Sequence, residues 1–126
     1  MNHPFMYAEL HTANPAAAKK FYTDLFGWGM KTHELPKGDY TEITTGEGPE
    51  AGLMGTSPYD GAESHWLPYI KVAELDEATC RAVALGAKVH VERTEVPETG
   101  WFTWLTDPTG ARFALWEKAV VNQSGS

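Results

Sequence analysis

Residues 7–28, YAELHTANPAAAKKFYTDLFGW, hold the signals that decide the fold. The aromatic and apolar segment from Phe5 to His11 is typical of a strand. Asn14 followed by Pro15 is a helix N-cap with proline at the first helical position, so a helix is expected to begin there. Gly27 is placed to end that helix in a left-handed conformation. Apolar residues recur at helical spacing and predict one stripe: Ala18, Phe21, Tyr22 and Leu25.

The rest of the chain repeats this order of elements. The first helix is followed by three predicted strands, over residues 29–35, 39–48 and 50–56. A second series then begins, with a strand over residues 65–72, a helix ending at Gly86, and strands over 87–96, 99–107 and 111–120. The helix of this second series has its own apolar stripe: Leu75, Ala78, Ala82 and Leu85. Each half therefore reads as a βαβββ module.

The two halves also match in register. Sliding one along the other brings Asn14 onto Glu74 and Leu53 onto Phe113, which indicates internal duplication. A chance match within an ordinary α+β domain is the alternative. The expected fold class is α+β, with two tandem modules forming an open, cupped mixed sheet and the helices on its convex face. We expect a single domain over residues 1–118, with modules 4–56 and 64–118, a connection 57–63 and a flexible tail 119–126.

Composition and charge exclude several classes of protein. The chain has 126 residues and 42% hydrophobic content, enough for a core of its own. A net charge of -7 argues against a nucleic-acid or anionic-membrane partner, which would need a basic patch. Apolar runs fall short of the roughly 20 residues that span a bilayer, and the N-terminus does not resemble a signal peptide, so a cytoplasmic protein is expected. The single Cys80 offers neither an internal disulfide nor a CxxC site.

Two stretches together resemble a known family. Residues 7–15 lead into Phe21-Tyr22 and Phe26-Gly27-Trp28, and residues 107–115, DPTGARFAL, form a turn before the last strand. In this order they resemble the glyoxalase/bleomycin resistance protein/extradiol dioxygenase, or vicinal oxygen chelate, superfamily. The likeness covers roughly residues 4 to 118. Asp107 and Pro108 suit the entry to a tight turn in which Gly110 supplies a positive φ.

The resemblance also implies where a divalent metal would bind. The positions that match the family's ligands are Tyr7, Met54, Leu67 and Ala114. Met, Leu and Ala cannot ligate a hard cation, so we expect that the usual metal site is lost and that no cofactor is bound. A rearranged site remains an alternative, because Glu9, His11 and His65 share strand parity with Tyr7 and Leu67.

Alternation along the first strand makes Glu9 the leading catalytic candidate. Ala8 and Leu10 are expected to face the helices, so Tyr7, Glu9 and His11 face the cavity. A buried carboxylate there is a candidate general base, or else a structural group hydrogen-bonded to a tyrosine or a backbone amide. Tyr69 is the duplication partner of Glu9, and the two are predicted to share a hydrogen bond.

The residues predicted to bind a ligand are Tyr7, His11, Met54, His65, Leu67, Ala114 and Trp116. His65 lies on the same face as Glu9, with a solvated edge histidine as its alternative. Trp116 shares the parity of Ala114 and is expected to stack on a planar ligand, whereas the other tryptophans are expected to pack in the core.

We therefore expect a metal-independent protein that binds a planar or aromatic small molecule in a concave cavity. The alternative is a lyase or isomerase with Glu9 as general base and Tyr7, Tyr69 or His65 holding a substrate oxygen. A third interpretation is an interaction module whose duplication is only architectural. The resemblance implies a homodimer, with no nucleic-acid or membrane partner.

Overall fold

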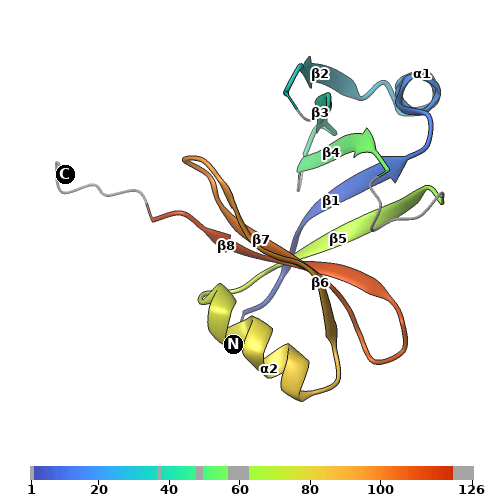
Figure 1. The fold of residues 1–126 in the computed structure, drawn as a ribbon. Coiled ribbons are helices and arrows are strands. Elements are labelled where there is room, and N and C mark those ends of the chain that lie inside the picture. Colours follow the sequence, from blue (N-terminus) through green and yellow to red (C-terminus); the bar gives the residue numbers. More distant parts are fainter. Residues whose placement is uncertain (1, 37, 48–49, 57–62, 121–126) are drawn as a thin grey trace, which may run out of the picture. The chain divides into compact units, whose positions relative to one another are not determined.

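A computed structural model describes residues 2–36, 38–47, 50–56 and 63–120 (Figure 1). Residues 48–49, residues 57–62 of the predicted connection and residues 121–126 of the predicted tail lie outside these ranges. Within them, no helix is both long and apolar enough to cross a membrane. The elements follow the predicted order: β1 (Phe5–Thr12), α1 (Pro15–Phe26), β2 (Gly29–His33), β3 (Tyr40–Thr44), β4 (Glu50–Gly55), β5 (His65–Lys71), α2 (Leu75–Ala84), β6 (Lys88–Val96), β7 (Gly100–Thr106) and β8 (Arg112–Lys118).

The strands form an open, eight-stranded mixed sheet in the order β2-β3-β4-β1-β5-β8-β7-β6. With its two helices, this confirms the predicted α+β class. The chain divides into two compact units, Met6–Pro68 and the described part of Tyr69–Ser126 together with residues 2–5. We call them the first and second units. The predicted module boundaries at residues 4–56 and 64–118 stay a prediction, as does the cupped shape of the sheet.

The first unit confirms the local signals at both ends of its helix. The Asn14 side chain accepts a hydrogen bond from the backbone N–H of Ala17, and Pro15 begins α1. Gly27 has φ 71°, the left-handed conformation expected of a helix-ending glycine. Strand β1 runs parallel to β4, while β3 is antiparallel to β4 and to β2. The core of this unit contains Leu10, Ile43, Ala51 and Leu53.

The predicted stripe on α1 is only half right. Ala18 and Tyr22 pack against the core of the first unit. Phe21 and Leu25, however, are each 57% exposed. The physical reason is that two positions four residues apart already cover the contact with the strands, so the flanking positions of the stripe turn toward water.

The second unit has the same order of elements. Strand β5 runs parallel to β8, and β7 is antiparallel to both β8 and β6. Its core contains Val72, Leu75, Leu105 and Leu115, with Ala78 and Ala82 packed against them. Leu85 is 69% exposed, contrary to the predicted stripe, because α2 ends at Ala84 and Leu85 is its C-cap. Gly86 follows with φ 108° instead of capping the helix itself.

The turn between β7 and β8 is held by Asp107. Its Oδ1 atom accepts hydrogen bonds from the backbone N–H groups of Thr109 and Ala111, at 2.8 and 3.0 Å, and from the Thr109 hydroxyl at 2.7 Å. These bonds, the Thr109 hydroxyl first, lower the pKa of the Asp107 carboxyl. Gly110 has φ 95°, as the sequence predicts for this turn.

The two helices begin in different ways. Asn14 caps α1 locally, whereas Glu74 at the start of α2 makes no side-chain cap bond among the described residues. Instead, the backbone N–H of Leu75 donates to Oε1 of Glu117 on β8, at 2.7 Å. The start of α2 is therefore capped by a residue far along the chain.

We expect Asn14→Ala to lower the free energy of unfolding by about 1 kcal/mol, because the first turn of α1 loses its acceptor. Glu74→Ala is the matched control and should change that free energy by less than about 0.5 kcal/mol. Urea denaturation of both variants measures the difference. Equal losses would show that the observed cap bond does not stabilise α1.

Candidate functional site

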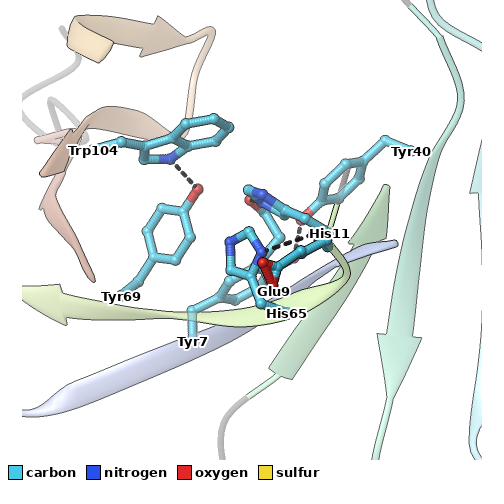
Figure 2. Close-up of polar contacts among 8 residues, drawn as sticks. Tyr7, Glu9, His11, Tyr40, His65, Tyr69 and Trp104 are labelled. Atoms are coloured by element: carbon cyan, nitrogen blue, oxygen red, sulfur yellow. Dashed lines mark hydrogen bonds and ion pairs between the residues drawn. The ribbon is translucent and has the colours of Figure 1, made fainter. Parts of the chain in front are cut away.

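A cluster of four hydrogen-bonded side chains lies in the first unit (Figure 2). We call Tyr7, Glu9, His11 and Tyr40 the Glu9 cluster. Oε1 of Glu9 lies 2.7 Å from Nε2 of His11, and Oε2 accepts a hydrogen bond of 2.8 Å from the Tyr40 hydroxyl. Tyr7, Glu9 and His11 are alternate residues of β1 and share one face, while Leu10 points into the core with α1. Strand alternation therefore places these side chains as the sequence indicated.

The carboxylate of this cluster is buried. Glu9 is 5% exposed and His11 is 0% exposed. Burying a charge is costly unless it is paired and hydrogen-bonded, and here each carboxylate oxygen has a partner. An ionised carboxylate only accepts hydrogen bonds, so Nε2 of His11 is the donor to Glu9 in that state. The pair fixes both the position of the carboxylate and the orientation of the imidazole.

His65 lies next to this pair. Its ring is 5.2 Å from the ring of His11, centroid to centroid, with an angle of 64° between the planes. His65 is half-buried, and its Nδ1 atom lies 3.3 Å from the carbonyl oxygen of Glu63. The first unit thus brings His65 beside the Glu9 cluster, as strand parity predicted. Its role as a ligand-binding residue stays a prediction.

The two tyrosines of the Glu9 cluster are held in their protonated form. Their hydroxyl groups are hydrogen-bonded to each other. Burial raises the pKa of Tyr7 from 10.0 to about 12, and the charge of Glu9 contributes to the shift. Burial followed by the charge of Glu9 also raises the pKa of Tyr40. Both phenols therefore act as hydrogen-bond donors at neutral pH.

Sequence reasoning missed Tyr40. The segment containing it was correctly predicted to be a strand, but its position beside Glu9 depends on the pairing of β3 with β4, in which Tyr40 lies opposite Met54. That pairing cannot be deduced from alternation alone, because alternation gives the face of a strand and not its neighbour.

Gly52 makes room for the two tyrosines. A Cβ atom on this residue would lie 1.9 Å from the Tyr40 hydroxyl oxygen and 2.4 Å from that of Tyr7. Gly52 is paired with Glu9 across β1 and β4, directly under the cluster. A side chain at this position would overlap the tyrosine pair, so the cluster depends on glycine there.

The side chains at the family's metal positions do not fit a divalent ion. Tyr7 and Met54 are partly buried, and Leu67 and Ala114 are fully buried. Three of these four have no oxygen or nitrogen donor in the side chain. Within the ranges that the structure describes, no three His, Cys, Asp or Glu side chains gather to hold a metal ion. The alternative of a rearranged site at Glu9, His11 and His65 stays a prediction.

The second unit contains a group of aromatic side chains that contact one another. We call Tyr69, Phe102, Trp104 and Trp116 the aromatic cluster. Nε1 of Trp104 donates a hydrogen bond of 2.9 Å to the hydroxyl oxygen of Tyr69, and both residues are buried (Figure 2). The predicted hydrogen bond between Tyr69 and Glu9 stays a prediction.

Strand pairing explains how the aromatic cluster forms. Phe102 lies opposite Trp116, while Ala114 pairs with both Tyr69 and Trp104. The small Ala114 side chain lies between two aromatic neighbours. The rings of Phe102 and Trp104 stack at 5.5 Å, and Tyr69 makes edge contacts with Phe102 and Trp116. Phe102 and Trp116 are only half-buried, so part of each ring remains accessible.

The raised tyrosine pKa values predict how stability depends on pH. The unfolded chain loses these phenol protons near pH 10, whereas folded Tyr7 holds its proton to about pH 12. The folded state then binds more protons, so the free energy of unfolding is retained below about pH 10 and falls as the pH rises toward 12. Denaturation between pH 8 and pH 11.5 measures this fall. The Tyr7→Phe/Tyr40→Phe double variant should show a flatter profile, and an identical slope would contradict the assignment.

Comparison with known proteins gives consistent results. The sequence matches the Glyoxalase/Bleomycin resistance protein/Dioxygenase superfamily over residues 4–115. It is 32% identical over 130 residues to the putative glyoxylase CFP32 of Mycobacterium tuberculosis, covering 95% of this chain and 50% of that protein. It is 29% identical to the anthracycline biosynthesis protein DnrV of Streptomyces peucetius, covering 90% of this chain and 46% of that protein. The chain thus spans about half the length of these curated relatives.

Solved structures share the fold. A methylmalonyl-CoA epimerase from Mycobacterium tuberculosis superposes with a TM-score of 0.68 at 15% identity, covering 92% of this chain and 88% of the epimerase. A hypothetical protein of Bacillus halodurans superposes with a TM-score of 0.72 at 14% identity, covering 98% and 100% of the two chains. The predicted resemblance is confirmed, and the chain belongs to the Glyoxalase/Bleomycin resistance protein/Dioxygenase superfamily.

Proposed function

We propose that the chain binds a planar, largely aromatic small molecule on the aromatic cluster of its second unit, without a metal ion. The observation that carries the proposal is the pair of half-buried rings, Phe102 and Trp116, that lie opposite each other on β7 and β8. Half-exposed rings beside a buried, hydrogen-bonded Tyr69–Trp104 pair offer a flat apolar surface on a rigid base.

The relatives support a ligand of this class. The Streptomyces proteins of similar sequence are named for anthracycline biosynthesis, and anthracyclines are built on fused, planar rings. The donor chemistry at Tyr7, Met54, Leu67 and Ala114 supports binding without a metal. The proposal for this chain therefore includes both a planar ligand and binding without a metal ion.

A fluorescence titration with a soluble anthraquinone sulfonate tests the proposal. Trp116→Leu should weaken binding by roughly three- to tenfold, because the stacking contact is lost while an apolar side chain remains. Trp66→Leu is the matched control: Trp66 is 37% exposed and donates to the Tyr22 hydroxyl within the first unit, so its loss should leave affinity unchanged. Equal affinity of all three proteins for the probe would refute the assignment of the site.

A second candidate function is proton transfer by Glu9. It is favoured by the Glu9 cluster, in which His11 and Tyr40 orient a buried carboxylate, and by the fold shared with methylmalonyl-CoA epimerases. In this scheme a carbon–hydrogen bond next to a substrate carbonyl breaks and its proton passes to Glu9. When substrate binds, the half-buried Tyr7 hydroxyl exchanges its hydrogen bond to Tyr40 for one to the substrate oxygen that gains negative charge, and the proton then returns to carbon.

Glu9→Gln distinguishes the two candidates. Deuterium exchange into methylmalonyl-CoA, followed by NMR, provides a direct readout of proton abstraction. Under the second candidate, Glu9→Gln should slow exchange at least about 100-fold, because the amide cannot accept the proton. Glu42→Gln is the control, since Glu42 is an exposed residue of β3 that contacts His33 and should leave exchange unchanged. Absence of exchange by the unmodified chain, or an equal rate in Glu9→Gln, would exclude Glu9 as the base for this substrate.

A further inference from the structure

A cavity lies entirely within the first unit. Its volume is about 550 Å³, within the range of small-molecule sites. It lies between the first turns of α1, the connection from β2 to β3, the start of β3 and the end of β4. The residues that matter for its chemistry are Lys19, Leu35, Tyr40, Leu53 and Met54.

This cavity reaches both faces of the strands. Leu53 and Thr41 lie on the face that packs toward α1, because Leu53 belongs to the core with Ala18. Tyr40 and Met54 alternate with them and lie on the other face. The cavity therefore wraps around the ends of β3 and β4. None of its lining residues belongs to the aromatic cluster, all of whose residues are in the second unit.

Among the described residues, the lining combines apolar and polar side chains with a half-buried cation, Lys19. Leu35, Leu53 and Met54 supply apolar surface. The ammonium group of Lys19 has a hydroxyl partner, Thr32 Oγ1, at 3.3 Å, and no carboxylate partner among the described residues. An ammonium group has three N–H donors, so Lys19 keeps donors for a ligand. Pro15, at the first position of α1, also lines the cavity, and the start of a helix favours negative charge.

We propose that this cavity binds a small organic acid, with its apolar body against Leu35, Leu53 and Met54 and its carboxylate on Lys19. Asp39 also lines the cavity, but it is exposed to water, which weakens its repulsion of an anion. The chain carries a net charge of -7, so an anion is retained only where a local cation holds it. This site goes beyond the proposed binding of a planar molecule in the second unit.

Tyr40 connects this cavity with the Glu9 cluster. One side of Tyr40 lines the cavity, and its hydroxyl donates to Oε2 of Glu9. A ligand in the cavity therefore contacts the residue that orients the Glu9 carboxylate. Ligand binding in the cavity should therefore affect the residues of the Glu9 cluster as well as the residues that line the cavity.

An NMR titration of the isotope-labelled chain with 4-phenylbutyrate and its neutral amide tests the site. The carboxylate probe should shift the backbone amide signals of Gly38, Thr41 and Gly55, which all line the cavity, and should bind at least about fivefold more tightly than the amide. Shifts confined to residues of the second unit, or no shifts at all, would overturn the proposal of this cavity site. Neither result would contradict the proposed site at the aromatic cluster.

Substitution of two adjacent lysines sharpens the test. Lys19→Gln should abolish the preference for the carboxylate probe. Lys20→Gln is the matched control, because Lys20 is exposed and pairs with Asp24 at 2.7 Å, outside the cavity. Lys19→Arg should restore the preference, which separates loss of charge from damage to the fold. An unchanged preference in Lys19→Gln, or equal loss in Lys20→Gln, would contradict the role of Lys19.

Discussion

The first unit is organised around one buried carboxylate. Glu9 is buried, and a buried charge is tolerated only when it has hydrogen-bond partners. His11 is the partner of one carboxylate oxygen and Tyr40 is the partner of the other. Several other features follow from this requirement. Tyr40 must approach from β3, Tyr7 must share its hydroxyl contact, and Gly52 must leave space beneath both rings. A carboxylate that needs this much support is positioned more firmly than an exposed one.

Each unit has a hydrogen-bond acceptor that receives a bond from an aromatic side chain on another strand, but the two acceptors differ chemically. In the first, an aromatic side chain on β3 donates a hydrogen bond to a carboxylate on β1; in the second, Trp104 on β7 donates to the phenol of Tyr69 on β5. The sequence match between Glu9 and Tyr69 thus corresponds to two acceptors in similar places of the two modules. One acceptor is charged and the other is neutral.

Sequence reasoning recovered those features that depend on neighbours in the chain. Asn14, Pro15 and Gly27 act through local backbone geometry, so the limits of α1 were predictable. Strand alternation likewise placed Glu9 and His11 on one face. The roles of Tyr40 and Gly52 were not predicted, because they depend on the register of β3, β4 and β1. This register is set by packing and not by composition. The exposure of Phe21 was not predicted for a related reason: the spacing of apolar residues along a helix does not determine how many of them the strands cover.

The Glu117 contact with the start of α2 has a consequence for the order of folding during synthesis. The first unit is complete once β4 and the beginning of β5 have left the ribosome. The second unit is different, because its first strand pairs with β8 and its helix is capped from β8. Both contacts require β8. The second unit is therefore expected to close only after β8 has been synthesised, whereas the strand pairs of the first unit need no residue beyond β5.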